Sequence, residues 1–119
     1  MLALPAAAAP MTLLEQARVF SDRAGRYAGM TEHQWMFDGP ASEDSARRRD
    51  QFADLPSAVS PDPEPQVTAE ILEWRVAARA AQRELLDTAA FVADRGRQQR
   101  AGRLASGYLV ACDRLIAGP

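Results

Sequence analysis

Apolar and small side chains recur at alternating intervals of four and three residues in the second half of the chain. They are Val67, Ile71, Trp74, Ala78, Ala81, Leu85, Thr88 and Val92. Because this spacing returns to one face of an α-helix, it predicts a long helix over residues 66–94. A second stripe of Leu104, Tyr108, Ala111 or Cys112, and Leu115 predicts a last helix over residues 98–117. Joined near Gly96, the two helices form an antiparallel hairpin over residues 66–117.

A capping box marks the start of an earlier helix. Thr12 can accept a hydrogen bond from the Glu15 backbone, while the Glu15 carboxylate reaches back to the Thr12 amide. Apolar or small residues then follow at the same spacing, at Leu13, Ala17, Phe20, Ala24 and Tyr27. Gly29 is a residue type that commonly ends a helix, so the first helix is predicted over residues 12–28.

Residues 29–65 carry no continuous apolar stripe. Ser42 is placed to cap a short helix that stops at Pro56. The prolines that follow predict an extended strap, at Pro61, Pro63 and Pro65. This segment is therefore predicted to be a Pro-rich, partly irregular insert.

These patterns together predict an all-α fold. It is a three-helix bundle built on the long hairpin, in a single helical domain over residues 12–119. Because the last helix is shorter than the long one, Val67, Ile71 and Trp74 are left uncovered by it. We expect helix one to cover them, with Phe20 and Tyr27 against Trp74. The alternative is that this open end binds a partner or a second copy.

Composition predicts a thin hydrophobic core. Of the 119 residues 47% are hydrophobic, but 24 are alanines, which bury little area each. A thin core favours stabilisation by a partner or by a second copy. The net charge of −2 gives no global attraction to nucleic acid. All 14 basic residues are arginines, as in GC-rich bacterial coding, so their abundance alone points to no ligand.

The start of the chain and its hydropathy bear on its location. Residues 1–11 are expected to be a disordered tail, with either Met1 or Met11 as the true start. They lack the positively charged opening of a secretory signal. No apolar run approaches the ~20 residues that span a bilayer. We therefore expect a cytoplasmic protein with no membrane contact.

Residues that could carry chemistry are sparse. His33 and Cys112 are the one histidine and the one cysteine, and neither has a companion at metal-ligand spacing. A single cysteine also forms no internal disulfide. The sequence has no Gly-rich phosphate loop and no nucleophile elbow. We expect no enzyme activity, no metal or cofactor and no small-molecule substrate.

Two groups of residues are candidates for binding. Trp35, Met36 and Phe37 stand together between two glycines, and such side chains are enriched at protein interfaces. With Trp74 they are the candidate partner-binding residues, although they could instead plug the open end of the hairpin. The second group surrounds the predicted turn and comprises Arg95, Arg97, Arg100 and Arg103. Arginine forks match phosphate oxygens, but a solvated turn would carry the same residues.

The function expected from these features is a non-enzymatic, small helical protein-interaction module. It would serve as an adaptor, a chaperone-like protein or an accessory subunit of a bacterial complex, binding another protein or a second copy. The general build is similar to that of many bacterial export chaperones, anti-factors and small accessory subunits. The alternative is a nucleic-acid- or phosphate-binding regulator that uses the Arg95–Arg103 turn.

Overall fold

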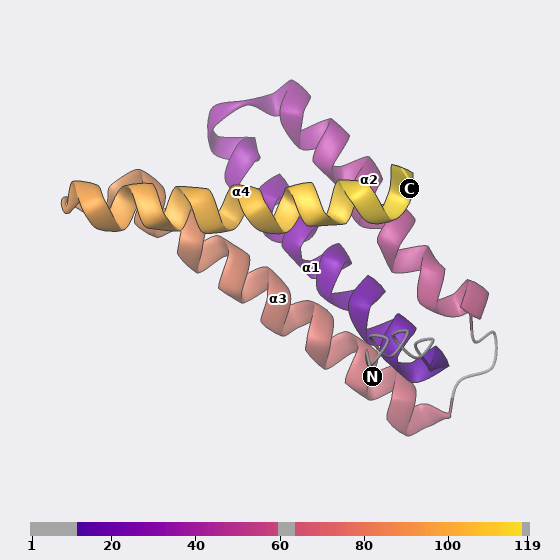
Figure 1. The fold of residues 1–119 in the computed structure, drawn as a ribbon. Helices are drawn as coiled ribbons and strands as arrows, with labels where there is room; N and C mark the ends of the chain where they lie inside the picture. Colours follow the sequence, from indigo (N-terminus) through magenta and orange to yellow (C-terminus); the bar gives the residue numbers. More distant parts are fainter. Residues whose placement is uncertain (1–11, 60–63, 118–119) are drawn as a thin grey trace, which may run out of the picture.

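The computed structural model describes residues 12–59 and 64–117, which form four α-helices (Figure 1). They are α1 (Leu13–Phe37), α2 (Gly39–Val59), α3 (Pro65–Phe91) and α4 (Arg95–Ala117). No β-strand occurs in these residues, so the predicted all-α class is confirmed. The tail predicted at 1–11 and most of the predicted proline strap lie outside the described residues.

Helix α1 begins as the sequence predicts and ends later. Thr12 Oγ1 accepts the Glu15 N–H at 3.1 Å, and Glu15 Oε2 accepts the Thr12 N–H at 3.4 Å. The pattern predicts an end at Gly29, whereas α1 continues to Phe37. Gly29 is buried against α3, where an added Cβ would lie 2.9 Å from the Arg79 carbonyl oxygen. This glycine therefore allows close helix packing and does not end the helix.

The insert predicted over residues 29–65 is largely helical. The last turns of α1 take up its beginning, and α2 takes up its middle. Asp38 caps α2, because its Oδ1 accepts the Ala41 N–H at 3.1 Å. Ser42, the cap that the sequence predicts, donates its hydroxyl to the Gly39 carbonyl oxygen at 2.6 Å. The predicted three helices thus become four, and the irregular insert becomes an element of the fold.

A sparse buried face explains why the apolar pattern misses α2. Pro56 lies inside the helix, in its last turn, where it removes one backbone hydrogen bond without ending the helix at once. Over residues 39–56, where burial is described, the buried side chains of α2 are Ser42, Ser45, Phe52 and Pro56. Only one of these is a large apolar residue, so the helical period is weak in the sequence.

Helix α1 lies between α2 and α3 and contacts both (Figure 1). Small residues bring the backbones of α1 and α3 together. A Cβ on Gly25 would overlap the Arg75 carbonyl oxygen and lie 2.7 Å from the Ala78 Cβ. The buried Ser21 hydroxyl donates to the Ala17 carbonyl oxygen at 2.7 Å, so this polar group is satisfied within α1.

The aromatic core lies between α1 and α2. Phe52 is fully buried, with its ring centroid 5.9 Å from that of Tyr27 and 6.5 Å from that of Phe20. These two rings therefore pack on Phe52 of α2, in place of the predicted contact with Trp74. Helix α1 does cover Trp74, but through Arg18, whose guanidinium carbon lies 5.5 Å from the ring centroid.

Helix α4 crosses over α3 and α1 from the turn that follows α3 (Figure 1). Over residues 95–112, where side-chain burial is described, its buried residues are small and are Ala101, Ala105 and Cys112. The fully buried Gln82 of α3 joins three helices: its Oε1 accepts from Arg26 and its Nε2 donates to the Ala105 carbonyl oxygen, both at 3.2 Å. Because this contact requires close approach, the small residues face inward. Leu104 and Tyr108, which the stripe predicts in the core, are exposed.

Candidate protein-interaction surfaces

Large apolar side chains gather where α1 and α3 end. Trp35, Met36 and Phe37 form the last turn of α1 and are 66%, 54% and 62% exposed. Phe91, the last residue of α3, is 64% exposed, and its ring centroid lies 6.3 Å from that of Phe37. We call these four residues the aromatic end. Apolar surface concentrated in this way marks contact sites on proteins.

The backbone beneath the aromatic end is fixed by polar contacts. Glu32 of α1 forms ion pairs with two arginines of α3, Arg79 and Arg83, each at 3.2 Å. On the other side, the Ser45 hydroxyl of α2 donates to Gln34 Oε1 of α1 at 2.6 Å. The exposed rings therefore project from a helix that is tied to both of its neighbours.

His33 lies one turn before Phe37, and the two ring centroids are 5.0 Å apart. Its Nδ1 is buried and has no hydrogen-bond partner among the described residues. Burial lowers the pKa of His33 below its ordinary value of 6.5; the Asp87 charge opposes this change and the Arg83 charge adds to it. The neutral imidazole is therefore favoured beside the aromatic end.

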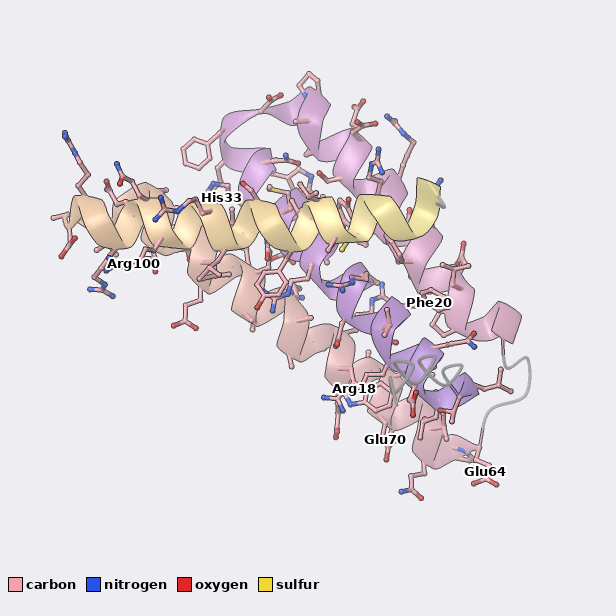
Figure 2. The ribbon with its side chains drawn as sticks, viewed as in Figure 1. Arg18, Phe20, His33, Glu64, Glu70 and Arg100 are labelled. Carbon is pink, nitrogen blue, oxygen red and sulfur yellow. The ribbon has the colours of Figure 1, made fainter. Side chains whose placement is uncertain are left out.

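The structure brings together three of the four predicted partner-binding residues. Trp35, Met36 and Phe37 share one turn, but Trp74 lies in the half of α3 beside Arg18. Figure 2 shows Arg18 and His33 far apart along α1, so Trp74 belongs to a different part of the surface. Phe91 was not among the predicted residues. Its position just outside the stripe of α3, directly before the turn, was the signal available in the sequence.

The predicted arginine group is exposed around the start of α4 and comprises Arg95, Arg97, Arg100 and Arg103, of which Arg100 is labelled in Figure 2. Asp94 caps the helix, with its Oδ1 accepting the Arg97 N–H at 3.1 Å. Backbone hydrogen bonds, first from Arg97 and then from Gly96, hold the pKa of Asp94 below its ordinary value of 3.8, and the nearby arginine charges add to this. The helix N-terminus that could hold a phosphate is thus already occupied by a carboxylate.

A groove with a cavity volume of about 350 Å³ runs between α3 and α4. We call it the α3–α4 groove; its lining residues are Arg26, Ala81, Glu84, Leu85, Thr88, Ala101, Leu104 and Tyr108. Leu104 is 54% exposed on its wall. The guanidinium carbon of Arg26 lies 3.8 Å from the centroid of the Tyr108 ring and closes one end. Leu104 and Tyr108, the two large residues of the α4 stripe that do not reach the core, line this groove.

Other kinds of site find less support. Among the residues that the structure describes, no three His, Cys, Asp or Glu side chains are grouped to hold a metal ion. No helix in the described ranges has the length and apolar character needed to cross a bilayer. Compared with protein-family models, with curated proteins and with solved structures, the chain matches none of them. The described residues define an all-α protein with exposed apolar surface.

Proposed function

We propose that this chain is a non-enzymatic protein-interaction module whose aromatic end binds another protein. The observation that carries the proposal is the exposure of four large apolar side chains on helix ends that are held in place. Covering one such side chain completely contributes on the order of 2 kcal/mol. Tryptophan and methionine are enriched at such contacts, and a few anchors commonly carry most of the affinity.

An adaptor, chaperone-like protein or accessory subunit of a bacterial cytoplasmic complex fits this kind of surface. In each of these roles, a small helical protein presents a fixed apolar patch to a larger one. The polar rim supports this assignment, because interfaces between separately folded proteins combine an apolar centre with charged surroundings. Asp38, the exposed residue that follows Phe37, supplies part of that rim.

Site-specific cross-linking tests the proposal. Trp35 is replaced by photoreactive benzoylphenylalanine in the full chain, which is then irradiated in its native cell. Leu72 of α3 is 60% exposed and provides a matched control position. A defined product with one other protein is expected from position 35 and not from position 72. Equal products from both positions would contradict a binding role for the aromatic end.

The cross-linked protein, once purified, allows a quantitative test. Trp35→Ala combined with Phe37→Ala should weaken the complex by at least ~2 kcal/mol, about 30-fold, because two anchors are lost. The free protein should keep its unfolding midpoint, since both side chains are exposed. Leu72→Ala combined with Val76→Ala is the control and should leave affinity unchanged. A large loss of stability with full affinity would instead identify the aromatic end as structural.

A second candidate function is a nucleic-acid- or phosphate-binding regulator. Its support is the exposure of Arg95, Arg97, Arg100 and Arg103 around one helix start. Asp94 weighs against it, since its carboxylate repels phosphate and already holds the Arg97 amide. Fluorescence anisotropy with a labelled duplex, repeated at ~50 and ~200 mM salt, distinguishes the two functions because phosphate-driven binding weakens steeply with salt. Absence of binding at the lower salt would exclude this second function.

A further inference from the structure

The α3–α4 groove combines exposed apolar side chains with one acidic and one basic residue. We propose that this groove is the contact surface between two copies of the chain. The copies are related by a two-fold axis that runs along α3 and α4, with both α3–α4 turns at the same end. This proposal uses no residue of the aromatic end and stands apart from the function proposed above.

The groove is lined from α3 and from α4. Ordered by distance along the chain from the turn, its apolar and small residues fall into three levels, with the pairs Thr88 and Ala101, Leu85 and Leu104, and Ala81 and Tyr108. In each pair the two residues stand about equally far from the turn that joins the helices. The 3.2 Å hydrogen bond from Gln82 to the Ala105 carbonyl oxygen shows that α3 and α4 touch at this level.

Rotation about the proposed axis lays α3 of each copy on α4 of the other at the same level. Ala81 then meets Tyr108 of the second copy, and the reverse contact follows by symmetry. A small residue thus lies opposite a large one, which fills the hollow above Ala81. Leu85 and Leu104 from both copies form the central layer. Each α3 then runs antiparallel to the α4 of the other copy.

The charges along the groove favour this arrangement. Glu84 is the acidic residue of its lining, and Arg100 and Arg103 are exposed on the α4 side, close to Leu104 along the helix. In the proposed pairing Glu84 lies against the stretch of α4 that carries these two arginines in the second copy. The alternative is a two-fold axis perpendicular to the helices. It would bring Glu84 near Glu84 of the second copy, and the two like charges would repel each other. Arg26 stays in its own chain, stacked on Tyr108.

The rest of the molecule also favours pairing. The large side chains among its buried hydrophobic residues are Tyr27, Phe52 and Leu86, and the remainder are alanines and one cysteine. Leu104 and Tyr108 add apolar area to the surface at one place, beside a concave wall. A second copy covers this area and stabilises the folded chain by mass action.

Sedimentation of the full chain at ~10 to ~100 μM tests the proposal, because dimers of moderate affinity populate this range. The wild type is expected to show twice the mass of one chain. Leu104→Glu should show the mass of one chain, since it places a carboxylate in the central layer. Val110→Glu is the matched control, because Val110 is 51% exposed on the same helix but does not line the groove. It should keep the dimer.

Charge reversal tests the arrangement of the two copies. Glu84→Arg should raise the dissociation constant at least ~10-fold, and adding Arg100→Glu and Arg103→Glu should restore most of the affinity. A wild type that sediments as one chain at ~100 μM would overturn the proposal. Dissociation by Val110→Glu as readily as by Leu104→Glu would also overturn it. The double variant Trp35→Ala and Phe37→Ala should keep the mass of the dimer. A failure of the dimer proposal can therefore be distinguished from a failure of the proposed partner binding.

Discussion

At Gly25 and Gly29 the absence of a side chain determines how closely two helices approach. Gly25 lies against the Arg75 carbonyl and the Ala78 methyl group, and Gly29 lies against the Arg79 carbonyl. Backbone atoms of α3 cannot move aside as a flexible side chain can. These two glycines therefore set the distance between α1 and α3. That distance also sets how close the α1 residues of the aromatic end lie to Phe91 of α3.

Gly25→Ala tests this role. Alanine usually stabilises a helix by up to ~1 kcal/mol over glycine, but here the overlap should cost more, for a net loss of ~1–3 kcal/mol. Gly107→Ala is the control, because no neighbouring atom lies within 4 Å of the added Cβ. It should gain up to ~1 kcal/mol. Urea unfolding measures both variants, and equal stabilities would show that α1 and α3 can separate without cost.

Phe52 is the largest side chain that α2 buries against α1. Phe52 is fully buried against Phe20 and Tyr27, while the other fully described buried positions of α2 are two serines and a proline. The hydrogen bond between Ser45 and Gln34 orients the start of α2 but buries little apolar area. Ala53 and Leu55 are partly buried against the same cluster, so Phe52 is the largest of three apolar contacts made by α2.

Phe52→Ala should remove that contact and cost ~3–5 kcal/mol, because it opens a cavity between two rings. The loss should be local first: amide exchange in α2 should rise more than in α3, which keeps its packing on α1. Gln51→Ala, at an exposed neighbouring position, is the control and should exchange like the wild type. Uniform acceleration in all helices would instead mean that α2 and α3 unfold as one unit.

The same elements show how far the sequence can be interpreted. The start of α1 was predictable because a capping box is a local signal of two residues. Helix α3 was predictable because its stripe is long. The extension of α1 past Gly29 was not, since a glycine that ends a helix and one that packs against a neighbour look alike. In α4 the predicted burial of Leu104 and Tyr108 was wrong, although Cys112 of the same stripe is buried. Pattern analysis favours large residues, whereas the contact with Gln82 selects Ala105.

The candidate site was predictable in its residue types and not in its environment. Trp35, Met36 and Phe37 stood out because large apolar residues between glycines need cover. Whether α2 covers these residues depends on where it packs along α1. Phe52 of α2 packs on Tyr27, which lies closer to the start of α1. Phe91 joins the aromatic end only through the tertiary approach of α3 to α1. Such long-range contacts leave no periodic mark in a single sequence.

Over the whole molecule, the small core and the exposed apolar groove link stability to concentration. If two copies pair, the folded state gains free energy as the protein concentration rises. The thermal midpoint of the wild type should therefore increase by a few degrees for each ~10-fold rise in concentration, and lie below about 65 °C in dilute solution. Leu104→Glu should show one midpoint at all concentrations. A wild-type midpoint that is high and independent of concentration would contradict this link.

Phe91 stands directly before the turn that joins α3 to α4, so the aromatic end lies beside that turn. In the proposed dimer both turns are at the same end, and the two patches face the same direction. A target with two matching segments would then bind bivalently, its second contact forming at an effective concentration in the millimolar range. Two individually weak contacts would then give tight binding through avidity. The distance between the two aromatic ends would select targets whose binding segments have a matching separation.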